Sequence, residues 1–278
     1  MQLEEIIKSA LEEDIRTGDI TTDATVGEDV KGSAKIISRQ EGIVAGLDVA
    51  KKTFHFVDAE LEIRLMRSDG DPVKPRGELI LLKGRLSSIL TAERVALNFL
   101  GRLCGIATLT RKFVEQVKNT GCVILDTRKT TPLLRDLEKY AVRMGGGQNH
   151  RSGLHDMYLI KENQIAAASS IGTALEKVFA HREKGQSKTL IEIEVATLDE
   201  LQTVLKYSVD LVLLDNMSVE EIKEAVRICN DRTKLEVSGG INLSNVREYA
   251  ETGVDFISVG QLTHSAPALD ISLLVLEE

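Results

Sequence analysis

Two cations stand side by side where an apolar stretch of the chain ends. The segment CVILDTRKTTP, residues 122–132, reads as a short buried strand that ends in Asp126, Arg128 and Lys129. Neighbouring side chains on a strand point to opposite faces, so Arg128 and Lys129 would point to opposite sides. A basic pair at a strand end is usually solvated surface. His150, Arg151 and Lys161 follow near the ends of later elements, however, and this argues against that interpretation.

Five potentially cationic groups in a protein of net charge -8 indicate a polyanionic ligand. Arginine suits a bidentate grip on a carboxylate, and lysine offers a point charge to a phosphate. His150 alone would more often be structural. It gains interest because the glycine-rich segment GGGQNHRSG, residues 145–153, places it beside Arg151, where the backbone can approach a ligand closely.

Two carboxylates are the acidic counterpart of these cations. Glu194 lies in IEIEV and Asp215 ends LVLLD, both of them apolar strand-like segments. They could be structural ion-pair partners of the cations, or they could hold Mg²⁺ or a ribose hydroxyl. Mg²⁺ prefers one or two carboxylates together with phosphate oxygens of a substrate, which suits such a site.

Two glycine-containing strand ends predict a phosphate site. EVSGGI, residues 236–241, contains Ser238, Gly239 and Gly240, and ISVGQLTHS, residues 257–265, contains Gly260 and His264. Glycine after a strand is common in tight turns, so either segment alone is weak. Together, at the last two strands of an α/β repeat, they would offer backbone N–H groups to a phosphomonoester, which favours a phosphosugar ligand.

The elements that must position these groups alternate regularly from residue 121 onward. Six apolar strands are expected, separated by amphipathic helices; they are CVILDT, MYLIKE, LIEIEV, LVLLDN, LEVSGG and FISVG. Strands that are apolar on both faces and joined by helices indicate a parallel sheet, either open or closed. Because polar groups follow every strand, we favour a barrel, in which the carboxyl ends of the strands converge on one mouth.

The first part of the chain, up to about residue 110, shows no such repeat. It predicts a helix near 2–13, then strands within GSAKIISRQEG and AELEIRLMRSDGDPVKPRGELILLKGRL. Residues 90–119 carry apolar side chains at helical spacing, and this predicts one long helix or two that break near Gly105.

Composition excludes several other classes of protein. The acidic net charge argues against general nucleic-acid binding. No apolar run approaches the roughly 20 residues of a membrane span, and the acidic amphipathic start does not read as a signal peptide. The three cysteines (Cys104, Cys122 and Cys229) have no metal or redox spacing, so we expect free thiols and a cytoplasmic protein.

At this point the sequence resembles the quinolinate phosphoribosyltransferase family over nearly its whole length. The segments that carry the resemblance stand in the family order; they are EDIRTGDITT, DGDPV, AERVALNFLGRLCGIAT, DTRKTTP, EKYAVRMGGGQNHRSGLHDMYLIKEN, LVLLDN, EVSGGI and SVGQLTHS. The central run is long and specific, so chance similarity is not a serious alternative.

The resemblance implies a fold and a reaction. The fold is an N-terminal α/β sandwich, residues 1–112, which 268–278 could join, and an incomplete seven-stranded α/β barrel, residues 113–267. The reaction converts quinolinate and 5-phosphoribosyl-1-diphosphate to nicotinate mononucleotide, diphosphate and CO₂, with Mg²⁺. Since six strands are clear, the seventh is expected just before GGGQNHR. The family also forms homodimers or larger homo-oligomers in which the sandwich of one subunit covers the barrel mouth of the other.

The resemblance also assigns residues. Arg128, His150, Arg151 and Lys161 match quinolinate-binding positions, and Arg94 matches an arginine that reaches the site from the partner. Lys129, Glu194 and Asp215 match catalytic positions near the ribose and diphosphate, with Mg²⁺ held by the two carboxylates, partly through water. The 5′-phosphate loops match at Ser238, Gly239, Gly240 and Gly260, with His264 beside them. Leu133, Gln148 and Gln164 depart from the common family pattern and affect loop shape more than the reaction.

Three alternatives are kept open. A paralogous phosphoribosyltransferase of the same fold, of the type associated with molybdenum transport, would act on another acceptor, although a monocarboxylate or neutral base needs fewer cations. A different barrel enzyme could use Lys161 in a Schiff base, which needs a desolvated lysine. A non-catalytic sugar-phosphate sensor would bind the ligand without releasing diphosphate.

Overall fold

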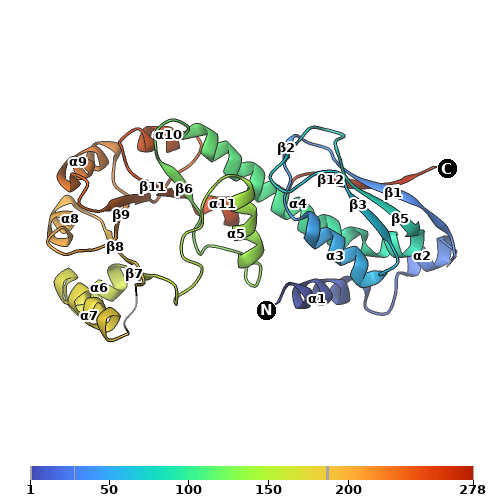
Figure 1. The fold of residues 1–278 in the computed structure, drawn as a ribbon, viewed down its shortest axis with the longest axis horizontal. Helices are drawn as coiled ribbons and strands as arrows, with labels where there is room; N and C mark the ends of the chain where they lie inside the picture. Colours follow the sequence, from blue (N-terminus) through green and yellow to red (C-terminus); the bar gives the residue numbers. More distant parts are fainter. Residues whose placement is uncertain (1, 28, 186–187, 278) are drawn as a thin grey trace. The chain divides into compact units, whose positions relative to one another are not determined.

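The chain folds into two compact units. The computed structural model describes residues 2–27, 29–185 and 188–277. Unit 1 comprises residues 1–111, 131–146 and 265–278, and unit 2 comprises residues 112–130 and 147–264. Figure 1 shows the elements of each unit.

Unit 1 contains an antiparallel sheet with the strand order β12-β1-β5-β3. Its strands are β1 (Lys31–Ser38), β3 (Glu62–Leu65), β5 (Glu78–Arg85) and β12 (Ile271–Leu276), and a separate pair is formed by β2 (Gly42–Ile43) and β4 (Pro72–Val73). The C-terminal strand β12 pairs with β1, so the end of the chain forms part of the first sheet. Its helices are α1 (Leu3–Ile15), α2 (Ile20–Thr25), α3 (Leu47–Val57), α5 (Arg135–Met144) and most of α4 (Leu86–Gln116).

The period of two along β1 and β5 explains the core of unit 1. Ala34 and Ile36 are fully buried and face Leu82 and Ile80 across the sheet. Residues on α3 and α4 complete this core, so each element buries one apolar face. Helix α4 continues through Gly105, where a Cβ would overlap the backbone carbonyl of Pro267. Gly105 therefore permits close backbone packing and does not break the helix.

Residues 131–146 belong to unit 1, whereas the boundaries expected from the sequence, 1–112 and 113–267, placed them in the barrel. The fully buried Glu138 of α5 accepts hydrogen bonds from Arg102 Nη2 at 2.8 Å and from Thr131 Oγ1 at 2.7 Å. Tyr140 Oη donates to Asp69 Oδ2 at 2.6 Å. These long-range polar contacts hold α5 against the first unit. The strand–helix rhythm of the sequence does not reveal them.

Unit 2 is built on a parallel sheet of six strands in the order β6-β11-β10-β9-β8-β7. These strands are β6 (Val123–Leu125), β7 (Tyr158–Ile160), β8 (Ile191–Val195), β9 (Leu211–Asp215), β10 (Lys234–Ser238) and β11 (Phe256–Ser258). All six were expected from the sequence. The seventh strand expected just before GGGQNHR is not found there, because those residues form α5; an isolated bridge within the described residues instead pairs Gln148, inside that segment, parallel with Leu125 of β6. The barrel is therefore incomplete, as expected.

Helices follow the strands of unit 2, and those between β7 and β11 lie outside the curved sheet (Figure 1). They are α6 (Glu162–Ala168), α7 (Ile171–Lys184), α8 (Leu198–Val204), α9 (Val219–Cys229), α10 (Val246–Ala250) and α11 (Gln261–His264). Helices α7, α8 and α9 begin at Ser or Thr caps that accept a backbone N–H. Ser218, for example, accepts from the backbone N–H of Glu221, and the Glu221 side chain reaches back to the N–H of Ser218. Local chemistry thus ends each strand at a defined residue and fixes which side chains reach the mouth.

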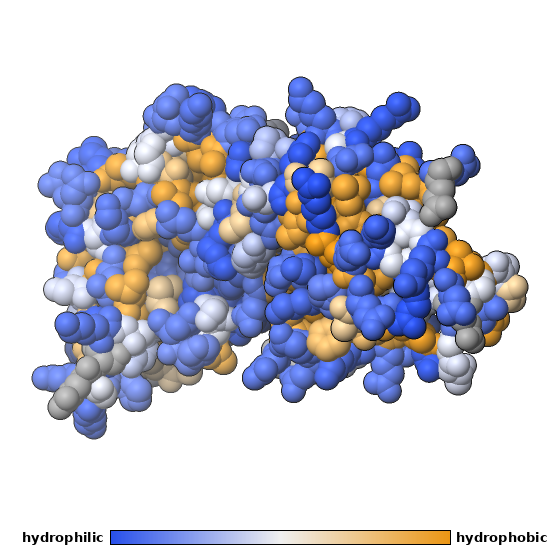
Figure 2. All heavy atoms as spheres, turned by 45° about the vertical axis from the view of Figure 1, so that its right-hand side comes forward, coloured by the Kyte–Doolittle hydropathy of each residue, from blue (hydrophilic) through white to orange (hydrophobic). Residues whose placement is uncertain are grey.

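The surface is mostly polar. Figure 2 shows hydrophilic side chains over most of one face, with apolar groups exposed between them. Among the described residues no helix is long and apolar enough to cross a membrane.

Candidate active site

A cavity of about 650 Å³ opens at the carboxyl ends of the strands of unit 2. It brings together most of the groups expected from the sequence. The residues that line it include Arg128, Lys129, His150, Arg151, Lys161, Glu194, Asp215, Ser238, Gly239 and Gly240. The alternation of strands and helices creates this arrangement, because parallel strands present their carboxyl ends to the same side.

The loop that carries His150 and Arg151 is fixed by buried Asp126, directly after β6. Its carboxylate accepts from the backbone N–H of His150 at 2.9 Å and from Asn149 Nδ2 at 2.5 Å. Farther along, Asp156 accepts from the backbone N–H groups of Ser152 and Gly153. These hydrogen bonds lower the pKa of Asp156 against the opposing effect of its burial. Hydrogen bonds to the carboxylates of Asp126 and Asp156 therefore hold this loop in place.

The two arginines of the cavity lie close enough to influence one another. Burial, and secondarily the charge of Arg128, lower the pKa of Arg151. Like charges brought together in a partly buried pocket repel each other, and an anion bound between them would relieve that repulsion. A carboxylate suits this place because it can accept two parallel N–H donors from a guanidinium.

Lys129 has different neighbours from Arg128, although the two are adjacent in sequence. A Cβ built on Gly260 would lie 3.1 Å from Lys129 Cδ and 3.3 Å from the ring of His264. The backbone carbonyl of Lys129 accepts from Thr263 Oγ1 at 2.8 Å. Lys129 therefore lies against the loop after β11. This contact also connects Gly260 and His264 to the site, although neither is among the cavity-lining residues.

Lys161 and the two expected metal ligands lie on the β7–β9 side of the cavity. Lys161 Nζ forms an ion pair with Glu194, and Asp215 Oδ2 accepts from Asn216 Nδ2 at 2.7 Å. Lys161 is 43% exposed and has a counter-charge, which is the opposite of a desolvated Schiff-base lysine. Because Glu194 and Asp215 offer hard carboxylate oxygens to the same cavity, this donor set fits Mg²⁺.

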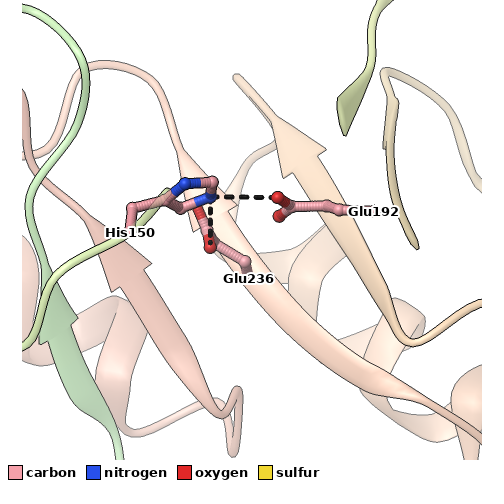
Figure 3. Close-up of side chains that lie close together, drawn as sticks. All are labelled: His150, Glu192 and Glu236. Atoms are coloured by element: carbon pink, nitrogen blue, oxygen red, sulfur yellow. Dashed lines mark ion pairs between the residues drawn. The ribbon is translucent and has the colours of Figure 1, made fainter. Parts of the chain in front are cut away.

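His150 faces two buried glutamates that sequence inspection did not single out (Figure 3). Its Nε2 lies 2.9 Å from a carboxylate oxygen of Glu192 and 3.4 Å from one of Glu236. Burial alone would lower the pKa of His150, but these carboxylates outweigh that effect and raise it to about 10. Burial raises the pKa of Glu192. The three groups could together hold a metal ion, but a histidine nitrogen makes the set a poor match for Mg²⁺.

The loop after β10 has the shape expected of a phosphate site. Gly239 and Gly240 both adopt left-handed backbone conformations, with φ of 95° and 63°. A Cβ on Gly239 would overlap the Asn216 side chain and lie 3.0 Å from the Asn216 backbone nitrogen, whereas a Cβ on Gly240 would meet open space. Gly239 is therefore needed for both conformation and space, and Gly240 for conformation alone.

Arg94 is the one expected site residue that belongs to unit 1. It is exposed on α4 and lines another cavity there, of about 280 Å³, with Asp14, Asp19 and Ile20. Its expected role in a partner's site stays a prediction, as do the roles of the other site residues.

Glu192 and Glu236 had a signal in the sequence. On β8, Glu192 and Glu194 are two residues apart, as are Glu236 and Ser238 on β10. Residues at this spacing share one face of a strand. A glutamate two residues before a recognised site residue on the same strand was therefore a candidate for the barrel interior.

Comparison with protein-family models places this site in a known family. The N-terminal domain of quinolinate phosphoribosyl transferase matches residues 19–104, and the C-terminal domain matches residues 106–274. The chain belongs to the quinolinate phosphoribosyltransferase family. A relative in this family, quinolinate phosphoribosyltransferase [decarboxylating] 2b of Nicotiana tabacum, is 40% identical over 98% of this chain and 82% of its own length. The probable nicotinate-nucleotide pyrophosphorylase [carboxylating] of Bacillus subtilis is 40% identical over 98% of this chain and 93% of its own.

Solved structures agree with this quinolinate phosphoribosyltransferase assignment. The nicotinate-nucleotide pyrophosphorylase of Francisella tularensis has a TM-score of 0.93 and 44% identity, covering 99% of this chain and 96% of that one. NadC from Streptococcus pyogenes has a TM-score of 0.93 and 37% identity, covering 99% and 98%. The expected fold, an N-terminal α/β domain followed by an incomplete α/β barrel, is confirmed.

The two glycines after β10 provide a matched pair of variants. Gly239→Ala combines left-handed strain with the overlap at Asn216 and should lower the free energy of unfolding by about 3 kcal/mol. Gly240→Ala adds strain alone and should cost about 1 kcal/mol. Denaturant unfolding of both variants measures the difference. Equal losses would show that the space beside Asn216 is not the constraint.

Proposed function

We propose that this protein transfers the phosphoribosyl group of 5-phosphoribosyl-1-diphosphate to quinolinate with loss of CO₂, producing nicotinate mononucleotide and diphosphate for NAD biosynthesis. The relatives named above carry this activity in their names. The observation that carries the proposal is that the guanidinium groups of Arg128 and Arg151 repel each other in one cavity, while Lys129 lies against a separate glycine loop. The site thus offers one place to a dicarboxylate and another to a phosphate or diphosphate.

Positioning supplies much of the catalysis. Quinolinate carries two carboxylates, and the second substrate carries a phosphate and a diphosphate, so the two molecules repel each other in water. Arg128, Arg151 and Lys161 bind the dicarboxylate, and the loops of Ser238 to Gly240 and of Gly260 bind the 5′-phosphate. Holding both anions at one mouth turns a disfavoured encounter into a reaction between adjacent groups.

Charge stabilisation supplies the next part. Departure of diphosphate leaves a ribosyl group with oxocarbenium character. Lys129 stabilises the leaving anion, and the carboxylates of Glu194 and Asp215 stabilise the cationic sugar. Glu194 and Asp215 would hold Mg²⁺, which would supply positive charge to offset that of the diphosphate. The pyridine nitrogen attacks the sugar, the positive ring nitrogen then stabilises the electron pair left at C2 as CO₂ departs, and C2 takes a proton from solvent to give nicotinate mononucleotide. No covalent enzyme intermediate is required.

The alternatives are less well supported. A Schiff base at Lys161 conflicts with its exposure and its ion pair with Glu194. A different acceptor, as in the molybdenum-transport type, would leave several cations of this cavity without an anion. A sensor would not need the carboxylate pair opposite Lys129. The relatives named above favour quinolinate over both of these.

The assembly and the location extend the proposal. We propose a homodimer in which Arg94 completes the partner's site, since the family resemblance assigns Arg94 there and the side chain is exposed. The cytoplasmic location stays a prediction. The plant relatives are named mitochondrial or chloroplastic, and the Bacillus subtilis relative carries no such label.

Quinolinate should be a far better substrate than nicotinate. Nicotinate lacks the 2-carboxylate, so its binding leaves half-buried cations of the cavity without that anion, at a cost of about 1–3 kcal/mol or more. This corresponds to a loss of roughly 10- to 100-fold in kcat/KM. Incubation with 5-phosphoribosyl-1-diphosphate, Mg²⁺ and quinolinate labelled in the 2-carboxylate should release CO₂ and diphosphate in equal amounts. Equal turnover of the two acids, or binding without diphosphate release, would contradict the proposed function.

The shared site predicts complementation between two inactive variants. Arg94→Ala and Lys161→Ala should each be nearly inactive alone. When the two are unfolded and refolded together, about half the dimers are mixed, and one site in each mixed dimer has both residues. Activity should then recover to roughly a quarter of that of the unaltered protein.

Two controls accompany this complementation experiment. Each variant refolded alone should stay inactive, and native mass spectrometry should confirm that subunits have exchanged. If exchanged dimers stay as inactive as their parents, Arg94 acts within its own chain.

A further inference from the structure

Glu192 and Glu236 are unusual because the barrel interior buries both carboxylates completely. Each is 0% exposed, and among the described residues their carboxylate oxygens have no hydrogen-bond partner apart from the contacts with His150 Nε2. Taking an ionised carboxylate out of water without hydrogen bonds costs several kcal/mol. Their counter-group is the edge of the His150 ring that carries Nε2 (Figure 3). Burying two such carboxylates lowers the stability of the fold. What they provide in return is a fixed environment for His150.

The ring of His150 is held from its other side as well. The backbone N–H of Arg151 donates to Nδ1 at 2.7 Å. A backbone N–H always donates, so Nδ1 must present a lone pair in this conformation. The ring proton is then on Nε2, facing the two carboxylates. The raised pKa of His150 would favour protons on both nitrogens. A second proton on Nδ1 would point at the hydrogen of the Arg151 N–H, so this conformation holds the ring with its one proton on Nε2.

The contacts at Nε2 and at Nδ1 of the ring both bear on the position of Arg151. The carboxylates orient the imidazole, and the imidazole in turn fixes the backbone of the residue that carries the second guanidinium of the cavity. Arg151 is half-buried, and its guanidinium Nη1 lies 3.4 Å from the carbonyl oxygen of Met157. A rotation of the imidazole would release the Arg151 N–H and shift this guanidinium relative to Arg128.

We propose that Glu192 and Glu236 are positioning residues that fix the Nε2–H tautomer and the orientation of His150, and through it place Arg151 for the dicarboxylate substrate. The identity of that substrate rests on the proposed function, whereas the tautomer of His150 does not. Neither glutamate reaches the reacting atoms in this role. The effect should therefore appear in quinolinate affinity, and the affinity for 5-phosphoribosyl-1-diphosphate should change little.

The test uses Gln and Leu variants at both positions. Glu192→Gln and Glu236→Gln keep the shape and one acceptor oxygen, so they should largely preserve the ring. Glu192→Leu and Glu236→Leu cannot accept from Nε2–H. They should raise the KM for quinolinate by roughly 10- to 100-fold, the usual effect of losing a partner that orients a functional histidine. The KM for 5-phosphoribosyl-1-diphosphate should change less than about threefold, and Glu220→Gln, at an exposed position, serves as the control.

Nuclear magnetic resonance of the imidazole nitrogens reads the tautomer without any turnover. The chain has five histidines, so His150→Asn identifies the signal that belongs to His150. The unaltered protein should show a proton on Nε2 and none on Nδ1, and the Leu variants should lose this single form. A proton on Nδ1 in the unaltered protein would overturn the proposal, even if the Leu variants failed to fold. Folded Leu variants with unchanged quinolinate KM, or with both KM values raised equally, would overturn it too. Failure of the proposed function would appear instead as absent turnover with the tautomer intact.

Discussion

Electrostatic repulsion between two anionic substrates is the constraint on which the rest of this site depends. A dicarboxylate and a sugar carrying three phosphate groups must lie in contact before any bond can form. An acidic protein can bring them together only by gathering cations locally. The parallel sheet of unit 2 does this because all six strands end on the same side. Arg128, Arg151 and Lys161, which are distant in sequence, then line one cavity.

Cations gathered in this way need internal counter-charges to hold their geometry without neutralising the site. Asp126 accepts a hydrogen bond from the backbone of the loop after Gln148, and Glu194 forms an ion pair with Lys161. Glu192 and Glu236 face His150 from positions that solvent does not reach. Acidic groups beneath the loop thus hold the backbone and the imidazole. Burial and, after it, the charge of Arg128 lower the pKa of Arg151, so these two guanidinium groups keep their mutual repulsion.

Patterns of period two and of strand–helix alternation predicted most of the fold. The six barrel strands and the helix from residue 90 onward were evident because burial on both faces, or on one helical face, leaves a repeated signal. Residues 131–146 were misplaced because their attachment to unit 1 depends on Glu138 and Tyr140, whose partners are far away in sequence. The seventh strand was placed wrongly, just before GGGQNHR, where α5 lies; the bridge at Gln148 is a single pairing, too short for any period. Glu192 and Glu236 were missed because a glutamate in an apolar strand shows its function only once its partner is known.

The central claim is that adjacent residues Arg128 and Lys129 serve different anions, and steady-state kinetics of two variants test it most directly. Arg128→Ala should raise the KM for quinolinate, since it removes a ground-state contact with the dicarboxylate. Lys129→Ala should lower kcat by roughly 100- to 1,000-fold with little change in that KM, because its charge is needed as diphosphate departs. If Lys129→Ala instead abolished quinolinate affinity while kcat held, the roles of the two residues would be exchanged and the account would be contradicted.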